Sequence, residues 1–440
     1  MAVQLRPVAC TMCAKWELLD ALCAPVKHVP RLLELDLKVS ELEERLVLLH
    51  SISEAEEFED IMKRVQNILH GEEEHPDFMV HSVCEPLLRG EGGGAFRWDR
   101  AGPGAPARPV LPAADYCRRL ASDSFSSRFP ADREETDFPL AFVVTAHKDF
   151  ETLEWLFRAI YRPHNLYCFH VDPKSPAVFK ERVDTLERCY PNVFLVSKSE
   201  PVIYAGFSRL QADINCMRDL LAADDRWRYV INLCGQDYPL KTNLEIVRHL
   251  KAFKGKNLTP GILPPGFAKQ RTAFVFKSVL SRSHSRVVKT NKLKARPPHG
   301  LTIYFGSAYY ALTRGFVSFL FEDRRALDLL EWSKDTYSPD EHYWVTLNRI
   351  PGVPGSMPSA TWDGNLRAIK WQGLKAGEKC YGHYVRAICI YGTGDLNWLD
   401  AEDSLFANKF ELHRYPPTLE CLEYRIHKQA LNLSTHSDTN

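Results

Sequence analysis

From residue 137 onward, apolar and polar positions recur with two alternating periods. Short apolar runs have the length of buried strands, and between them apolar residues return at helical spacing. The predicted strands are 138–146, 166–171, 193–196 and 229–233, and the predicted helices are 150–161, 175–188 and 207–221. Strands separated by single helices require right-handed crossovers. We therefore expect an α/β fold whose mixed, mostly parallel sheet is covered by helices on both faces.

In such a sheet, ligands bind outside the carboxyl ends of the strands. Residues at and just beyond these ends are therefore candidates for a ligand site. They are Thr145, Ala146 and His147 at the first strand, Asp172, Pro173 and Lys174 at the second, and Gly235, Gln236 and Asp237 at the fourth.

Outside this region the pattern is simpler. Leucines at helical spacing predict a helix over 30–71, and the Gly/Pro-rich stretch 90–112 predicts a linker. The apolar run 303–321 is interrupted by Gly306, Arg314 and Gly315, which favours a buried strand and helix over a membrane span. We divide the chain into an atypical helical N-terminal segment without a visible anchor (1–80), a stem (81–115), a globular domain (116–425) and a C-terminal tail (426–440).

Charge and cysteine content narrow the choice of partner and compartment. The 56 basic and 56 acidic residues cancel, so no global field favours nucleic acid or an anionic membrane. Nine of the 12 cysteines are dispersed from Cys84 onward, which favours disulfides in an oxidising compartment over a zinc site. Cys10 and Cys13 form a CxxC without a second pair at zinc spacing, so we do not expect a metal there.

The residues at the strand ends suggest how a nucleotide could be held. Asp172 can bind a ribose or uracil by hydrogen bonds, although Asp-Pro also begins ordinary solvated turns. No Asp-x-Asp pair stands at a strand end, so an essential Mg²⁺ or Mn²⁺ is not expected. Fixed cations can stabilise a leaving diphosphate instead, and Arg386 and Lys409 are the candidates, although surface Arg and Lys are common.

Ser338 to Glu341 have two interpretations. Ser338 can cap a helix whose first turn holds Pro339 and two acids, which favours a capping motif. Alternatively Glu341, next to Tyr343 and Trp344, is a general base that takes a proton from a sugar hydroxyl. The pattern by itself leaves both open.

Seven longer motifs add a resemblance. They are FRAIYRP (157–163), YCFHVD (167–172), RLQADINC (209–216), NLCGQDYPLKTN (232–243), SPDE (338–341), GDLNW (394–398) and LFANKF (405–410). With these motifs the chain, from about Cys84 to Cys421, resembles the β-1,6-N-acetylglucosaminyltransferases of the core 2 and I-branching family, glycosyltransferase family 14. The resemblance implies a GT-A-like fold and metal-free, inverting transfer of GlcNAc from UDP-GlcNAc to a galactose or GalNAc 6-hydroxyl.

The resemblance also assigns residues. It implies that Thr145, Ala146, His147, Asp172, Pro173, Lys174 and Tyr204 line the UDP-GlcNAc site, that Arg386 and Lys409 grip the diphosphate, that Glu341 is the base, and that Arg271 binds the acceptor. It pairs Cys84 with Cys421, Cys117 with Cys189, Cys168 with Cys216 and Cys380 with Cys389. Cys234 is left over, as a small buried hydrophobe. Asn432 and, more weakly, Asn257 begin N-glycosylation sequons.

The acceptor glycan and the cellular compartment follow less directly from the sequence. Pro260–Ala268 lacks the acidic and basic pair of core 2 enzymes, and stretches 254–261, 332–342 and 354–358 look closer to I-branching members, so we expect poly-N-acetyllactosamine on glycoproteins or glycolipids as acceptor. A core 1 O-glycan acceptor and an inactive glycan- or UDP-binding relative are the alternatives. The resemblance implies a Golgi membrane enzyme, although residues 1–80 show no signal or anchor.

Overall fold

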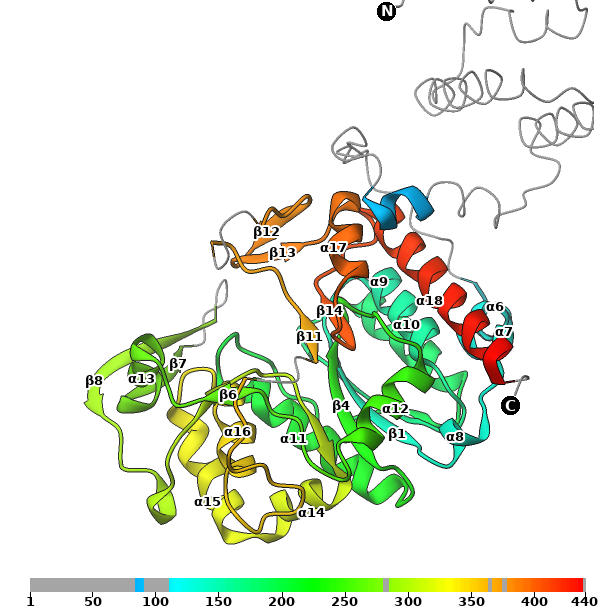
Figure 1. The fold of residues 1–440 in the computed structure, drawn as a ribbon. Helices are drawn as coiled ribbons and strands as arrows, with labels where there is room; N and C mark the ends of the chain where they lie inside the picture. Colours follow the sequence, from blue (N-terminus) through cyan, green and yellow to red (C-terminus); the bar gives the residue numbers. More distant parts are fainter. Residues whose placement is uncertain (1–83, 91–110, 280–284, 363–365, 374–377, 438–440) are drawn as a thin grey trace, which may run out of the picture. The chain divides into compact units, whose positions relative to one another are not determined.

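The computed structural model describes residues 84–90, 111–279, 285–362, 366–373 and 378–437, and Figure 1 shows their fold. The predicted helix 30–71, the Cys10 and Cys13 pair and most of the predicted linker lie outside these residues. No helix within the described ranges combines the length and the apolar character that crossing a bilayer requires.

A five-stranded sheet forms the centre of the domain, in the order β10 (Ala311–Thr313), β4 (Tyr229–Cys234), β1 (Leu140–Ala146), β2 (Leu166–Val171) and β3 (Val193–Leu195). β1 pairs in parallel with both β2 and β4, and β2 pairs in parallel with β3. Only β10 runs antiparallel, along β4. The mixed, mostly parallel sheet and the four strands predicted by periodicity are thereby confirmed.

Helices cover both faces because β1 alternates its buried side chains between them. Phe142 and Val144 pack into one core with α6 (Ala113–Asp123), α9 (Phe150–Ile160), α10 (Ala177–Arg188) and α12 (Asn243–Ala252). Ala141 and Val143 pack into a second core with α11 (Phe207–Ala223), α14 (Arg314–Glu322), α15 (Arg324–Trp332) and α16 (Tyr343–Asn348). In Figure 1 the two helix groups lie on opposite sides of β1 and β4. This is the expected GT-A-like α/β arrangement.

A smaller layer follows at the carboxyl ends of the strands. β5 (Asp237–Pro239) and β11 (Arg367–Ala368) flank β14 (Phe406–Asn408), and β12 (His383–Val385) pairs with β13 (Ile388–Ile390) in a hairpin. The remaining elements are α7 (Phe125–Arg128), α8 (Arg133–Thr136), β6 (Gly261–Ile262), α13 (Gly266–Ala273), β7 (Phe274–Val279), β8 (Arg286–Leu293), β9 (Phe305–Gly306), α17 (Leu396–Asp400), α18 (Pro416–Ser437), and the 3-10 helices η2 (Pro298–Gly300), η3 (Ser333–Asp335), η4 (Pro339–Glu341) and η5 (Thr393–Asp395).

Four disulfides close the domain, and all four predicted pairings are confirmed. The pairs are Cys84–Cys421, Cys117–Cys189, Cys168–Cys216 and Cys380–Cys389. The first pair spans 337 residues and attaches the helical turn at 84–89 to α18. Such long-range links remove many conformations from the unfolded chain.

One predicted element boundary is wrong, and the capping interpretation of Ser338 holds in part, because Ser338 is at the N-cap position of η4 and Pro339, Asp340 and Glu341 form its first turn. The predicted tail from residue 426 is part of α18, and Ile426 and Ala430 are buried against Phe125, because the helix has an apolar face that needs cover. Ser338 does not cap a helix with its side chain. It is left-handed, with φ 46°, and η4 is followed by α16, which begins only at Tyr343.

Candidate active site

The ends of β1, β2 and β4 meet as predicted. Asp172 N donates to Ala146 O over 3.1 Å, and Gly235 N donates to Thr145 O over 3.0 Å. Thr145 is fixed further by a hydrogen bond of 3.3 Å from its hydroxyl to Leu233 O. The predicted strand-end residues therefore form one continuous rim.

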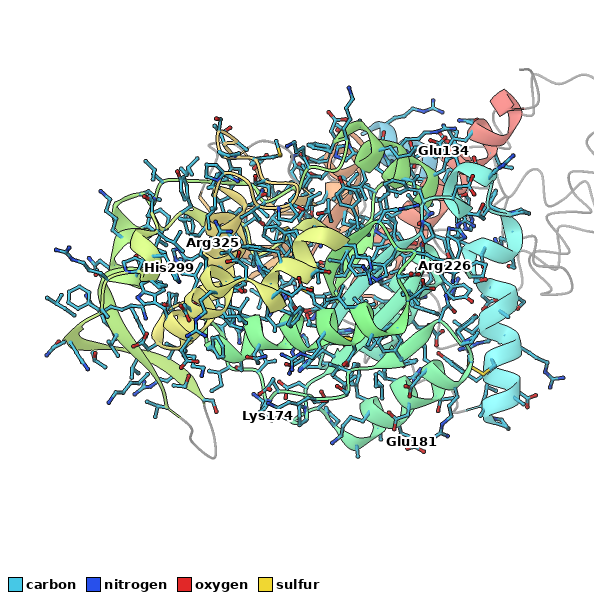
Figure 2. All side chains as sticks on the ribbon, turned by 90° about the horizontal axis from the view of Figure 1, so that it is seen from below. Glu134, Lys174, Glu181, Arg226, His299 and Arg325 are labelled. Atoms are coloured by element: carbon cyan, nitrogen blue, oxygen red, sulfur yellow. A yellow bond between two sulfur atoms is a disulfide. The ribbon has the colours of Figure 1, made fainter. Side chains whose placement is uncertain are left out.

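Asp172 serves this rim chiefly through a turn. Its carboxylate accepts hydrogen bonds from Lys174 N (2.9 Å) and Val202 N (3.2 Å), and it is buried. Lys174 lies at the surface (Figure 2), where its ammonium donates to Val202 O and stands 3.5 Å from the Asp172 carboxylate. Asp172, Pro173 and Lys174 thus clamp the loop that leads to Tyr204, which favours the turn interpretation without removing Asp172 from the rim.

Arg386 reaches the same rim from the turn of the β12–β13 hairpin. Arg386 and Ala387 both have positive φ, 52° and 64°, as the two central residues of a type I′ turn require. Glycine or asparagine usually occupies such positions, so this backbone is strained. The turn presents the exposed guanidinium of Arg386, which lies 4.5 Å from the centre of the Tyr204 ring. Exposed Trp371 lies beside this turn through a bridge to Ile388.

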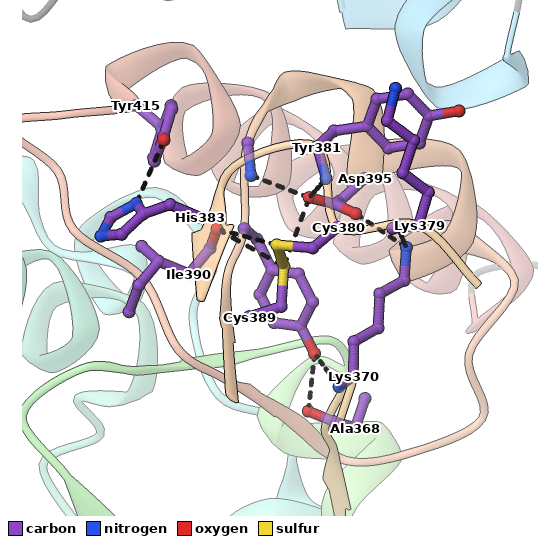
Figure 3. Close-up of a disulfide and its surroundings, with 12 residues drawn as sticks. Ala368, Lys370, Lys379, Cys380, Tyr381, His383, Cys389, Ile390, Asp395 and Tyr415 are labelled. Carbon is purple, nitrogen blue, oxygen red and sulfur yellow. Dashed lines mark hydrogen bonds and ion pairs between the residues drawn. A yellow bond between two sulfur atoms is a disulfide. The ribbon is translucent and has the colours of Figure 1, made fainter. Parts of the chain in front are cut away.

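Buried polar contacts fix the base of this hairpin (Figure 3). Asp395 accepts hydrogen bonds from Gly392 N (2.9 Å) and Tyr381 N (3.1 Å), and its carboxylate lies 2.7 Å from the Lys370 ammonium. The Cys380–Cys389 disulfide joins the two sides of the hairpin's base. The disulfide and this fully buried ion pair hold the turn that carries Arg386.

Lys409 follows β14 and faces the same rim. Its backbone joins β13, since Tyr391 N donates to Lys409 O over 3.0 Å. Partial burial lowers the pKa of Lys409, and the nearby charges of Arg386 and Lys148 lower it further. Partial burial and the charge of Lys148 lower the pKa of His147, Lys409 and Arg386 lower it further, and Asp172 opposes them. His147, Arg386 and Lys409 therefore lie close enough to one another for the charges of the two cations to influence the pKa of the imidazole.

Cys234 is free, as predicted, but it is not a simple hydrophobe. Its thiol donates to Asp237 Oδ1 over 3.3 Å and accepts from Asn408 Nδ2 over 3.1 Å. Burial and the charge of Asp237 raise the pKa of Cys234 to about 12, so the thiol stays protonated. Asp237 itself, fully buried, also faces Arg367 at 3.2 Å. The carboxylate links β4, β11 and β14 beneath Lys409.

Glu341 lies in η4, where it forms an ion pair with Arg271 from α13. The two residues are 70 positions apart in the chain. Burial and the neighbouring Asp340 carboxylate raise the pKa of Glu341 to about 7, although Arg271 opposes this. Tyr343 and Trp344, predicted to surround Glu341, are instead fully buried in the hydrophobic core to which α16 contributes. A carboxylate with a pKa near neutrality is suited to general base catalysis.

Sequence reasoning missed the charges beneath Glu341. Asp340 is buried, and burial raises its pKa, while Arg209 and Asp213 of α11 lie close enough to shift it in opposite directions. Arg209 donates to Asp213, which also accepts from Tyr310 OH over 3.2 Å. The i, i+4 spacing of Arg209 and Asp213 was visible in the chain, but their proximity to Asp340 depends on how α11 packs against η4.

Tyr204 joins the two ends of the site. Burial raises its pKa, the charges of Tyr337 and Glu341 act in the same direction, and Arg386 and Arg271 oppose them. The adjacent Ala205 O accepts from Ser338 N over 2.8 Å. The 61% exposed Tyr204 side chain therefore lies beside Arg386, and its loop is bonded to the segment that carries Glu341.

The two predicted sequons differ. Asn257 is fully buried, and its amide donates to Asn348 Oδ1 (3.1 Å) and Pro354 O (2.8 Å), so it cannot carry a glycan in the folded protein. That prediction is wrong because the asparagine serves as an internal hydrogen-bonding residue. Asn432 is exposed on α18 and stays a prediction.

One group of potential metal ligands occurs within the described ranges, formed by Cys380, Cys389 and Asp395. The two sulfur atoms are bonded to each other, and Asp395 is occupied by Lys370. This group is therefore a structural element of the hairpin.

Comparison with known proteins identifies the family of the chain. The model of the Core-2/I-Branching enzyme family matches residues 140–400. An N-acetyllactosaminide beta-1,6-N-acetylglucosaminyl-transferase of Homo sapiens is 62% identical over 302 residues, which cover 68% of this chain and 75% of the relative. The protein of that name in Mus musculus is 58% identical over 358 residues, covering 81% of this chain and 87% of the relative.

A third relative, from Homo sapiens, is called probable beta-1,3-galactosyl-O-glycosyl-glycoprotein beta-1,6-N-acetylglucosaminyltransferase 7. It is 45% identical over 359 residues, which cover 80% of this chain and 84% of the relative. The matched range contains the strand ends, Tyr204, Glu341 and Arg386, and it ends before Lys409. The chain belongs to the Core-2/I-Branching enzyme family.

Proposed function

We propose that this protein transfers GlcNAc from UDP-GlcNAc to the 6-hydroxyl of galactose in poly-N-acetyllactosamine, which creates β-1,6 branches. The names of the relatives at 62% and 58% identity support the reaction and the acceptor. The observation that carries the proposal is a chain of contacts: the Arg386 guanidinium lies 4.5 Å from the centre of the Tyr204 ring, and the adjacent Ala205 O accepts from Ser338 N in the segment that carries Glu341.

The proposed reaction is one in-line displacement. The acceptor O6 gives its proton to the Glu341 carboxylate and forms a bond to C1 of GlcNAc, while the bond between C1 and the diphosphate oxygen breaks. The departing electron pair stays on UDP, whose charge Arg386 and Lys409 stabilise. Attack opposite the leaving group inverts the anomeric carbon, so an α-linked donor yields a β-1,6 product.

We propose that no divalent cation takes part. Arg386 and Lys409 approach the rim from one connected unit, because Lys409 O is bonded to Tyr391 N and the neighbouring β13 leads back to the Arg386 turn. Two fixed positive charges can balance a diphosphate without the ordering that a bound metal needs.

The Golgi lumen is the proposed compartment. Four disulfides in the described part of the chain support an oxidising lumen, where such bonds persist. Glycoprotein and glycolipid glycans are the proposed acceptors. A core 1 O-glycan remains the second candidate, because the third relative's name specifies β-1,3-galactosyl-O-glycosyl acceptors.

The test is a transfer assay with the full chain, produced through the secretory pathway behind a cleavable signal. UDP-GlcNAc is offered with N-acetyllactosamine and with the core 1 disaccharide in parallel, and the linkage of the product is determined by NMR. We expect a β-1,6 product chiefly on N-acetyllactosamine. A larger product yield on the core 1 disaccharide would make core 1 O-glycans the favoured acceptor. UDP binding without any transfer would indicate a catalytically inactive relative.

A further inference from the structure

Three aromatic side chains, Phe267, Phe305 and Trp362, form a surface that we call the aromatic ridge. The ridge lies beside the ion pair of Arg271 and Glu341. The Phe305 ring lies 5.5 Å from Phe267 and 5.7 Å from Trp362, centre to centre. Phe267 is 65% exposed and Trp362 is 38% exposed. Neighbouring Ile262 and Leu263 are exposed as well, at 42% and 60%. Apolar surface gathered in this way usually marks a binding site.

The ridge is fixed by its backbone. Ile262 in β6 pairs with Phe305 in β9, and Gly261 N donates to Thr361 O over 3.0 Å. The buried Arg349 guanidinium donates to Thr361 O and Gly261 O, over 3.4 Å and 3.1 Å. Because β6, β9 and the residue before Trp362 are bonded together, the surface is preformed, which lowers the entropy cost of binding.

The aromatic ridge contacts Arg271, which forms the ion pair with Glu341. The Arg271 guanidinium lies 5.7 Å from the centre of the Phe267 ring, 5.2 Å from Phe305 and 5.3 Å from Tyr337. The same guanidinium forms the ion pair with Glu341. The ridge is therefore within reach of a ligand whose hydroxyl contacts Glu341, since the Arg271 guanidinium lies beside both Phe267 and Glu341.

The chemistry of the ridge selects a sugar face. A pyranose presents C–H groups on its faces and hydroxyls around its edge. An aromatic ring can therefore cover one face while the hydroxyls stay hydrogen-bonded to water. Two guanidinium groups take part in these contacts: Arg271 is paired with Glu341, and Arg349 is buried and donates to the backbone oxygens of Gly261 and Thr361. A ligand with a phosphate or carboxylate would find no free partner in these contacts, whereas a neutral sugar needs none.

We propose that the aromatic ridge is an acceptor subsite that binds the sugar linked to the reacting galactose, with Phe267 stacked on its pyranose face. In an N-acetyllactosamine unit this sugar is GlcNAc, whose acetamido methyl adds apolar surface. The inference rests on the proposed function and extends it, because it identifies Phe267 as a residue that determines affinity for the second sugar of the acceptor.

The test measures binding of N-acetyllactosamine to the full chain saturated with UDP, by titration calorimetry, together with initial rates. Phe267→Ala removes the ring, Phe267→Tyr keeps it, and Leu293→Ala removes an equally exposed apolar side chain (70%) from β8 as a control. We expect Phe267→Ala to raise the Kd and the acceptor KM about fivefold to tenfold, with the KM for UDP-GlcNAc unchanged. Phe267→Tyr should regain most of the affinity that Phe267→Ala loses, and Leu293→Ala should match the wild type.

The outcomes separate the inference from the proposed function. If the wild type transfers GlcNAc but Phe267→Ala leaves the Kd unchanged, the subsite is wrong and the function stands. If the wild type makes no product but Phe267→Ala weakens binding, the subsite stands and the function fails. A loss confined to kcat would mean that Phe267 acts only by placing Arg271. An effect seen only with glycopeptide or glycolipid acceptors would assign the ridge to the carrier, and either result overturns the inference.

Discussion

Replacing Glu341 by glutamine tests the central chemical claim. Glutamine has nearly the same shape, and its amide oxygen can still accept from Arg271, so the fold and the position of Arg271 should be kept. What disappears is the proton acceptor. Removing a general base typically costs about 10² to 10⁴ in rate, so we expect kcat to fall by that factor while the KM for UDP-GlcNAc changes little.

The pH at which the rate rises provides a second, independent test of Glu341 as the base. Burial and Asp340 together outweigh Arg271 and raise the pKa of Glu341 to about 7. The base works only when it is deprotonated. The wild-type kcat/KM should therefore be low at acid pH, rise through about pH 7 and level off above it. In Glu341→Gln this rise should be lost, since no carboxyl remains to titrate.

The assay is the initial rate of GlcNAc transfer to N-acetyllactosamine over a pH series on both sides of 7, for wild type and Glu341→Gln. UDP binding and the thermal midpoint of unfolding show that the variant is folded. Glu341 is not the base if Glu341→Gln turns over at a near-normal rate. It is also excluded if the wild-type rate stays flat through neutral pH while the variant is inactive, because its role would then be structural.

Two further predictions concern the cations. EDTA should leave activity largely intact, and the metal-free proposal fails if EDTA abolishes transfer and Mn²⁺ restores it. Arg386→Ala should raise the KM for UDP-GlcNAc about tenfold to a hundredfold, because a charge-assisted contact to the diphosphate is lost. Ala387→Gly, its neighbour in the turn, should keep that KM and raise the unfolding midpoint by relieving about 1 kcal/mol of strain at its φ of 64°; equal KM changes in both variants would refute the role of Arg386.

The central strands and their helices could be read from the sequence because each depends on neighbours in the chain. The period of apolar residues placed β1, β2, β3 and β4 to within a few residues, and a parallel sheet then required that Thr145, Asp172 and Gly235 lie on one rim. The disulfide pairings could not be predicted in this way. The spacing of the cysteines did not decide which of them pair, and the family resemblance supplied the pairings.

Local rules failed where a residue's role depends on distant segments. Ser338 matched a helix cap, yet its amide is bonded to Ala205 O and its side chain caps nothing. Asn257 matched a sequon, yet the core uses its amide. Cys234 was expected in apolar surroundings, but Asp237 and Asn408 surround its thiol. In each case buried polar groups needed hydrogen-bond partners, and the fold provided them from elsewhere in the chain.

The sequence by itself determined the α/β class, the rim of strand ends and the residue types of the site. Only the tertiary structure decided that Arg271 pairs with Glu341, that Arg386 stacks on Tyr204, and that Phe267 stays exposed beside them. The physical reason is the range of the forces involved. Periodicity reports contacts within a few residues, whereas charge pairing, burial and the resulting pKa of Glu341 depend on which segments the packed sheet and helices bring together.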